Sequence, residues 1–324
     1  MLTFSPPDEI STHRNQHGLP SIGILVTNLG TPSAPTKSSV RKYLKEFLSD
    51  PRVVEANRLV WWCVLNGIIL NIRPARSAKA YKGIWTKDGS PLLVHSERQA
   101  LLLQESIIRN GLENAHVELA MRYGHPSIKM GLEALRAKGC GKILILPLYP
   151  QYAAATTAST FDAVSDILRE WRWVPETRTV SSYHDHGLYI QALSNSIREH
   201  WREHGKPDYL LMSFHGIPKR YHVQGDPYPC FCHKTARLVA ANLGLTKDQW
   251  TIGFQSRFGR EEWVKPYTDE ILKSWGKEGA KRVDVICPGF SADCLETIEE
   301  IAVENCAAFL NSGGEEFYYI PALN

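Results

Sequence analysis

The segment "LLMSFHGIP" (210–218) is an apolar run that ends at a turn. Continuous hydrophobicity over a few residues is typical of a strand covered on both faces, as in parallel sheets. Gly216 and Pro218 then turn the chain, so His215 stands at the carboxyl end of this strand. Open parallel sheets bind their ligands beyond that end of the strands.

Similar apolar runs alternate with helix-like segments along the whole chain. The expected strands are 22–29, 116–123, 142–149, 177–183, 208–214, 250–256 and 282–288. The amphipathic segments are 37–48, 95–110, 126–138, 159–171, 188–204, 233–243, 265–277 and 293–309. This alternation predicts an α/β protein with a doubly wound parallel sheet.

The strand endings repeat in the same order, which indicates two similar halves. The matching segments are "TNLGTP" (27–32) with "SFHGIP" (213–218), "MRYGHPSI" (121–128) with "SRFGREEW" (256–263), and "LPLYPQYAAATTASTFDAV" (146–164) with "CPGFSADCLETIEEI" (287–301). We therefore predict two similar doubly wound, Rossmann-like parallel-sheet domains facing a central cleft.

The first domain would span 20–178 and the second 179–324, after a polar tail at 1–19. Superposing "TNLGTP" on "SFHGIP" matches Leu29 with His215. One half thus presents an apolar side chain where the other presents an imidazole.

Composition excludes several classes of protein. The 324 residues are 43% hydrophobic and 22% charged, as in a globular protein, and the net charge of +3 is too even for nucleic-acid binding. Seven cysteines do not suggest a disulfide framework, and the polar amino terminus is no signal peptide, so we expect a cytoplasmic protein.

The longest apolar run, 59–70, is too short to cross a bilayer. It is either a buried helix or an apolar lip. Basic residues flank it, which would suit a membrane surface or an apolar ligand.

Two features of the second half could carry chemistry. His215 could act as a base, an acid or a metal ligand. On an α-helix, four acids after the last strand would form one stripe opposite Leu295, Ile298, Ile301 and Ala302: Asp293, Glu296, Glu300 and Glu304. The stripe is either the solvated face of a surface helix or a ladder that moves protons or cations.

The motifs resemble one family, the ferrochelatases, over nearly the whole chain. The segments that carry the resemblance are "NLGTP…VRKYLKEFLSDPRVVE" (28–55), "MRYGHPSI", "LPLYPQY", "LLMSFHGIPKRYHVQGDPYPC", "FQSRFGREEWVKPYTDE" and "CPGFSADCLETIEEI". The likeness is to the enzymes of Gram-negative bacteria. It implies insertion of ferrous iron into protoporphyrin IX, the last step of haem synthesis.

The resemblance also implies residue roles. His215 and Glu296 match the family's catalytic pair, which serves as proton acceptor or as metal ligand. Three acids match a proton or metal relay: Asp293, Glu300 and Glu304. Five residues match porphyrin contacts: Leu29, Arg122, Tyr123, Tyr228 and Trp263. The segment 52–85 resembles the hydrophobic lip of the active site.

We expect iron as a substrate, with no permanently bound cofactor and no iron–sulfur cluster. Ala155 stands where some relatives place a cluster ligand, and no cysteine follows Cys306. Protoporphyrin IX and ferrous iron are the expected partners. Peripheral contact with the inner membrane or with the preceding enzyme of the pathway stays open.

Two alternatives remain at this point. A porphyrin or haem carrier would need the lip and the cleft but no acidic ladder. A cobalt chelatase for another tetrapyrrole would share the architecture, although the long "GDPYPC" and "FQSRFGREEW" motifs favour a ferrochelatase.

Overall fold

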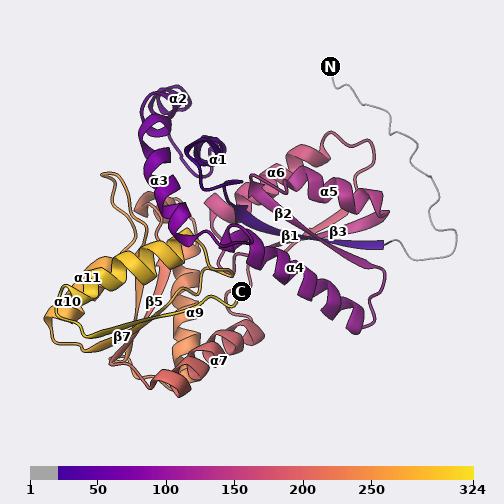
Figure 1. Cartoon of the computed structure of the whole chain (residues 1–324). Helices are drawn as coiled ribbons and strands as arrows, with labels where there is room; N and C mark the ends of the chain where they lie inside the picture. Colours follow the sequence, from indigo (N-terminus) through magenta and orange to yellow (C-terminus); the bar gives the residue numbers. More distant parts are fainter. Residues whose placement is uncertain (1–20) are drawn as a thin grey trace. The chain divides into compact units, whose positions relative to one another are not determined.

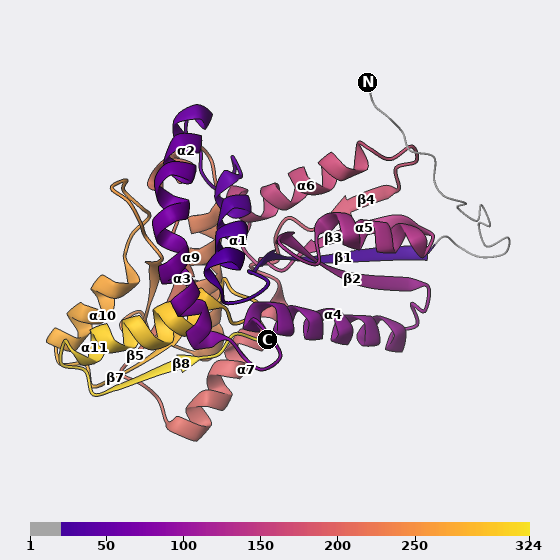
Figure 2. The ribbon, with the colours of Figure 1, turned by 45° about the horizontal axis from the view of Figure 1, so that its top comes forward.

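The computed structural model describes residues 21–324, which form two compact α/β units. Unit 1 comprises the chain up to Lys79, Asp88–Leu148 and Ala154–Ser181, and unit 2 comprises Ala80–Lys87, Tyr149–Ala153 and Ser182–Asn324. The polar tail predicted at 1–19 lies outside the described residues. Figures 1 and 2 show the helices and strands of each unit.

Each unit contains four parallel strands in the same spatial order. The order is β2-β1-β3-β4 in unit 1 and β6-β5-β7-β8 in unit 2. The strands are β1 (Ser21–Gly30), β2 (Ala115–Tyr123), β3 (Cys140–Pro147), β4 (Glu176–Thr179), β5 (Tyr209–His215), β6 (Trp250–Gln255), β7 (Arg282–Ile286) and β8 (Glu316–Ile320). The prediction of two similar, doubly wound Rossmann-like domains is confirmed. The central cleft stays a prediction.

Helices cover both faces of each sheet. In unit 1, α5 (Ile128–Ala137) packs against α6 (Ser159–Leu168) on one face, and α4 (Pro91–Arg109) lies on the other (Figure 2). In unit 2, α7 (Gly187–His204) packs against α9 (Tyr228–Leu243), and α10 (Thr268–Lys277) packs against α11 (Cys306–Leu310). The crossover from β5 to β6 runs along the sheet in the direction opposite to those from β6 to β7 and from β7 to β8, so right-handed connections put the two pairs on opposite faces.

The other helical segments flank the strand ends. They are α1 (Lys37–Ser49), α2 (Arg58–Val64), α3 (Leu70–Ile84), α8 (Lys219–Val223) and the π-helices η1 (Leu65–Ile69), η2 (Ala154–Ala158) and η3 (Glu296–Asn305). Both η2 and η3 follow the third strand of their own sheet. The two halves therefore share a π-helix at the same place.

Two glycines let the first and second strands of each sheet approach closely. A Cβ on Gly30, whose φ is +111°, would lie 1.8 Å from the carbonyl oxygen of Tyr123. A Cβ on Gly216 would lie 2.9 Å from the carbonyl oxygen of Gln255. A side chain at either position would therefore push the strands apart at their carboxyl ends.

The strand registers align the halves residue by residue. Asn28 pairs with Met121 in unit 1, and Phe214 pairs with Phe254 in unit 2. The next residues along the first strands are Leu29 and His215, so their predicted correspondence is confirmed.

One of the three predicted matches between segments of the two halves is out of register. Met121 N–H donates to the carbonyl oxygen of Pro126, and Phe254 N–H donates to that of Pro266. Met121 therefore corresponds to Phe254, whereas matching "MRYGHPSI" with "SRFGREEW" equates Met121 with Ser256. The loop before Pro266 is longer, so the two motifs look alike in letters but are displaced in space.

The buried acid Asp284 offers a test of how unit 2 is stabilised. Its carboxylate accepts hydrogen bonds from Trp201 Nε1 at 2.9 Å and Arg282 Nε at 3.2 Å. Asp284→Ala would leave both donors without this partner, so the free energy of unfolding should fall by about 3–5 kcal/mol in urea titrations.

The matched control is Lys281→Ala, which breaks the exposed ion pair of Lys281 with Glu315. Exposed pairs contribute little, so this variant should unfold close to the wild type. Equal losses in the two variants would contradict a structural role for the buried acid.

Candidate active site

The candidate site lies at the carboxyl ends of β5 and β7 in unit 2. The chain leaves β5 for β6 on one side, and β7 lies on the other side of β5. This reversal is a topological switch point, where doubly wound sheets bind their ligands. His215 is the last residue of β5, and Glu296 is the first residue of η3, which follows β7.

His215 presents one ring nitrogen for chemistry. Its Nδ1 lies 2.6 Å from the carbonyl oxygen of Gly216, a contact that assigns the hydrogen to Nδ1. Nε2 then carries the lone pair, which can accept a proton or bind a metal ion. The ring centroid lies 6.4 Å from that of Trp263.

Gln255 links His215 to Glu296, and its role was missed by the sequence analysis. Gln255 pairs with His215 in the sheet, and its side-chain Nε2 donates to the carbonyl oxygen of Glu296 at 2.9 Å. Its Oε1 accepts from Ser213 Oγ at 2.7 Å. A buried polar residue at the end of an apolar strand is the only sequence signal that could have identified it.

The acids of η3 are not on the α-helix that we predicted. Residues 296–305 form a π-helix, in which each N–H bonds five residues back. Thr297, Ile301 and Asn305 are its buried residues. Of the four residues predicted opposite the acids, Ile301 is buried, whereas Leu295, Ile298 and Ala302 are half-buried. A π-helix has more residues per turn than an α-helix, so side chains four residues apart stay on one side of it. Glu296, Glu300 and Glu304 therefore form a row next to the row of buried residues.

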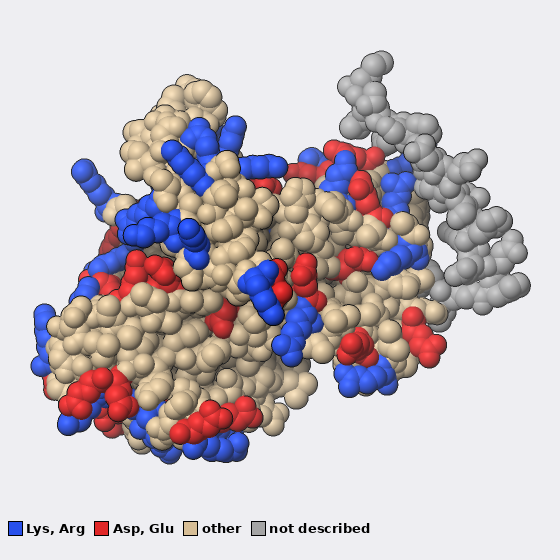
Figure 3. Space-filling model, in the orientation of Figure 1, with Lys and Arg blue, Asp and Glu red and all other residues tan. Residues whose placement is uncertain are grey.

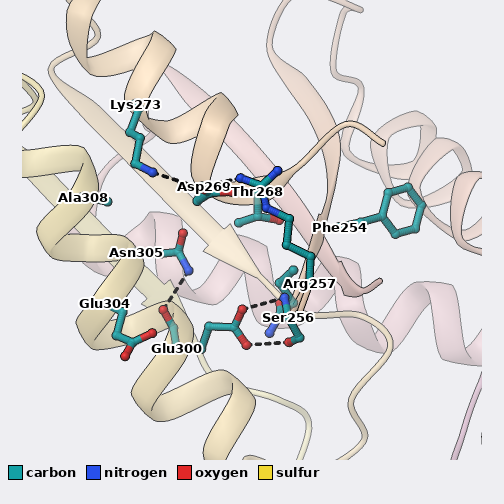
Figure 4. Close-up of a pocket in the computed structure, with 11 residues that line it drawn as sticks. Phe254, Ser256, Arg257, Thr268, Asp269, Lys273, Glu300, Glu304, Asn305 and Ala308 are labelled. Atoms are coloured by element: carbon teal, nitrogen blue, oxygen red, sulfur yellow. Dashed lines mark hydrogen bonds and ion pairs between the residues drawn. The ribbon is translucent and has the colours of Figure 1, made fainter. Parts of the chain in front are cut away.

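Glu300 lines a pocket of about 300 Å³ within unit 2 (Figure 4). Glu304 lines the same pocket and is exposed, and Arg257, Asp269 and Lys273 supply further charges. Carboxylate oxygens grouped in this way can accept protons or hard cations.

The pKa of Glu300 is raised, mainly because burial disfavours its charged form. Hydrogen bonds from Ser256 and the charge of His215 act in the opposite direction, and the charge of Glu296 raises the pKa further. The three groups therefore sense one another electrostatically. Raised carboxyl pKa values are typical of groups that exchange protons near neutral pH.

Asp293 is held by structural hydrogen bonds. Its Oδ1 accepts from Thr297 Oγ1 at 2.9 Å, Tyr319 Oη at 2.5 Å and Ala322 N–H at 3.3 Å. Its Oδ2 accepts from Asn324 Nδ2 at 2.8 Å. These bonds tie Asp293 to Thr297 on η3, to β8 and to the segment after β8, and its predicted place in the relay stays a prediction.

Arg122 and Tyr123 belong to a buried network of unit 1. The Tyr123 hydroxyl and Arg122 Nη2 both donate to the carboxylate of Asp50, at 2.8 and 2.6 Å. Ser159 Oγ donates to the same carboxylate, and Arg122 Nε donates to Ser159. Burial raises the pKa of Asp50, but these donors outweigh burial and the pKa is lowered overall. Tyr123 is fully buried, and within unit 1 its role is structural.

The other predicted porphyrin contacts differ in exposure. Tyr228 and Trp263 are buried in unit 2, with Trp263 Nε1 donating to the carbonyl oxygen of Phe258. Burial and the nearby Cys232 raise the pKa of Tyr228 well above its usual range. Leu29 is half-buried at the end of β1 in unit 1. Of the five residues matched to porphyrin contacts, Trp263 is the one with a ring contact to His215 within a single unit.

The helices α2, η1 and α3 expose an apolar surface, so a buried helix at 59–70 is excluded. Its exposed side chains are Leu59, Val60, Trp62, Ile68 and Ile72. Figure 3 shows uncharged atoms at the tip of these helices, with Lys and Arg side chains gathered next to the tip. No helix among the described residues is long and apolar enough to cross a membrane.

No group of three His, Cys, Asp or Glu side chains within 21–324 is arranged to hold a metal ion. The pair of His215 and Glu296 would supply one nitrogen and one carboxylate, a mixed set that suits a borderline ferrous ion in transit.

Asp293→Asn tests the structural reading of that residue. The new amide nitrogen would face donors, so the free energy of unfolding should fall by about 1–3 kcal/mol in urea titrations. Glu304→Gln, at an exposed position, should leave stability unchanged. Unchanged stability of Asp293→Asn with a slower reaction would instead place Asp293 in the relay.

Comparison with known proteins gives a consistent picture. The family model described as Ferrochelatase matches residues 21–324. The ferrochelatase of Thioalkalivibrio sulfidiphilus is 59% identical over 310 residues, covering 95% of this chain and 84% of the relative. That of Aromatoleum aromaticum is 58% identical over 309 residues, covering 95% of this chain and 85% of the relative.

Solved structures are similar in fold. SirB from Bacillus subtilis with Fe³⁺ gives a TM-score of 0.51 at 12% identity, covering 94% of this chain and 89% of that one. The sirohydrochlorin chelatase SirB in complex with cobalt gives a TM-score of 0.50 at 11% identity, with the same coverage of 94% and 89%. At such identities the likeness shows the fold alone.

Proposed function

The chain belongs to the ferrochelatase family, and we propose that it inserts ferrous iron into protoporphyrin IX. Family membership makes it an enzyme that inserts iron into a porphyrin in haem synthesis, which rules out the carrier reading. The preference for protoporphyrin IX rests on the likeness to relatives from Gram-negative bacteria.

The observation that carries the mechanism is the bridge from His215 to Glu296 through Gln255. Metallation removes two pyrrole protons and admits one metal ion. His215 Nε2 and the Glu296 carboxylate accept the protons, and Glu300 and Glu304 pass them to solvent through the pocket they line. In the alternative mechanism, His215 and Glu296 bind the entering iron instead of accepting the protons.

Distortion of the porphyrin ring would contribute part of the acceleration of iron insertion. A flat porphyrin holds its nitrogen lone pairs in the ring plane, where a metal ion cannot reach them well. Binding energy from contacts such as that with Trp263, beside His215, would be used to tilt the pyrroles. Arg122 already uses two guanidinium nitrogens on Ser159 and Asp50, so we assign it chiefly to positioning.

The exposed apolar tip of α2–α3, with basic side chains beside it, also suits peripheral contact of a cytoplasmic enzyme with the inner membrane. The porphyrin macrocycle is apolar and its propionates are acidic, so an apolar surface next to basic side chains would suit the substrate as well as a membrane.

Anaerobic mixing of the protein with ferrous iron and protoporphyrin IX tests the proposal. Absorbance should report rapid metallation by the wild type, and His215→Ala and Glu296→Gln should each slow it at least 100-fold while porphyrin fluorescence still shows binding. Coproporphyrin should be metallated with a lower kcat/KM.

Lys281→Ala is the control for handling and folding, since Lys281 is a surface residue on the opposite end of β7. Full activity of both site variants would reject the His215–Glu296 mechanism. Faster turnover with coproporphyrin would reject the proposed substrate.

A further inference from the structure

Ser256, which follows β6, has an unusual backbone. Within 21–324, it and Asn324 are the two non-glycine residues with a positive φ, and the φ of Ser256 is +68°. Such a conformation is uncommon for residues with a side chain and persists where the surroundings hold it.

Both hydrogen-bond donors of Ser256 reach one carboxylate. Its N–H donates to Glu300 Oε1 at 2.6 Å, and its hydroxyl donates to Oε2 (Figure 4). Gln255, one residue earlier, holds the carbonyl oxygen of Glu296. Two successive residues thus fix η3 at two of its acids.

Unit 1 also uses these two positions to hold other segments, although its carboxylate, Asp50, follows α1 and not the third strand. The register equates Arg122 with Gln255 and Tyr123 with Ser256. Arg122 Nε donates to the carbonyl oxygen of Ser159, in the helical segment after β3, and the Tyr123 hydroxyl donates to Asp50. A second-strand residue that clamps a buried carboxylate is therefore a repeated feature of the fold.

We propose that Ser256 is a positioning residue for metal insertion, whose two donors fix the Glu300 carboxylate between Glu296 and the pocket. The inference rests on the proposed function and goes beyond it, because Ser256 acts through Glu300.

Several charged groups surround Glu300, and the hydrogen bonds of Ser256 stabilise its charged form against the effect of burial. His215 on β5 and Glu296 on η3 act on it with opposite signs, and Arg257, Asp269, Lys273 and Glu304 line the same pocket. Burial raises the pKa of Glu300, and the Ser256 hydroxyl is the strongest group opposing that rise. Without the hydroxyl, Glu300 should take up its proton at higher pH.

Ser256→Ala should therefore lower kcat for iron insertion about tenfold, with KM for porphyrin within about twofold. The acid limb of the pH–rate profile should move to higher pH. Ser256→Gly, which keeps the N–H and accepts a positive φ, should show the same shift without loss of thermal stability.

Ser274→Ala is the matched control, because its hydroxyl also donates to a carboxylate, that of the exposed Glu278 at the C-cap of α10. This variant should keep wild-type kcat and pH profile. In a Glu300→Gln background, Ser256→Ala should cause no further slowing. An unchanged kcat for Ser256→Ala, or equal slowing in both backgrounds, would overturn the inference.

A second measurement is independent of turnover. Infrared difference spectra between the protein and Glu300→Gln follow the titration of the Glu300 carboxylate. That titration should move to higher pH in Ser256→Ala, and an unmoved titration would overturn the inference even if the wild type inserted no iron. Failure of the wild type to insert iron would overturn the proposed function instead.

Discussion

The buried amide of Gln255 is the contact on which the site depends. It pairs with His215 in the sheet, accepts from Ser213 on β5, and donates to Glu296 at the start of η3. Because both ends of the amide are used and the residue is buried, the side chain cannot turn without leaving polar groups unpaired. The backbone of Glu296 is thus held to the strand that pairs with His215.

The internal repeat explains how one half came to hold this chemistry. Both sheets have the same strand order, and both place a π-helix after the third strand. In unit 1, Leu29 stands at the position of His215, and Arg122, Tyr123 and Ser159 form a buried network around Asp50, which follows α1. In unit 2, His215 is partly exposed at the end of β5, and the partly buried Glu300 lines a pocket. The same scaffold serves stability in one unit and reaction in the other.

Sequence patterns predicted the parts of the fold that depend on burial. The strands were recognisable because residues such as Leu211, Met212 and Phe214 are buried on both faces of the sheet. Strand β8 was missed, since "EFYYI" is short and only partly buried at the sheet edge. The π-helix was also missed, because its register depends on Gln255 and Ser256, about 40 residues away in sequence, rather than on helix propensity. The roles of Gln255 and Asp50 are likewise set by distant partners.

The central claim is that His215 and Glu296 act as one unit at the switch point of the second sheet. The most direct test is the single-turnover rate of iron insertion, with porphyrin already bound, in His215→Ala, Glu296→Gln and the double variant. Residues that act as a unit are strongly non-additive, so the double variant should be no slower than the slower single variant. Losses that multiply in the double variant would show two independent contributions and contradict the account.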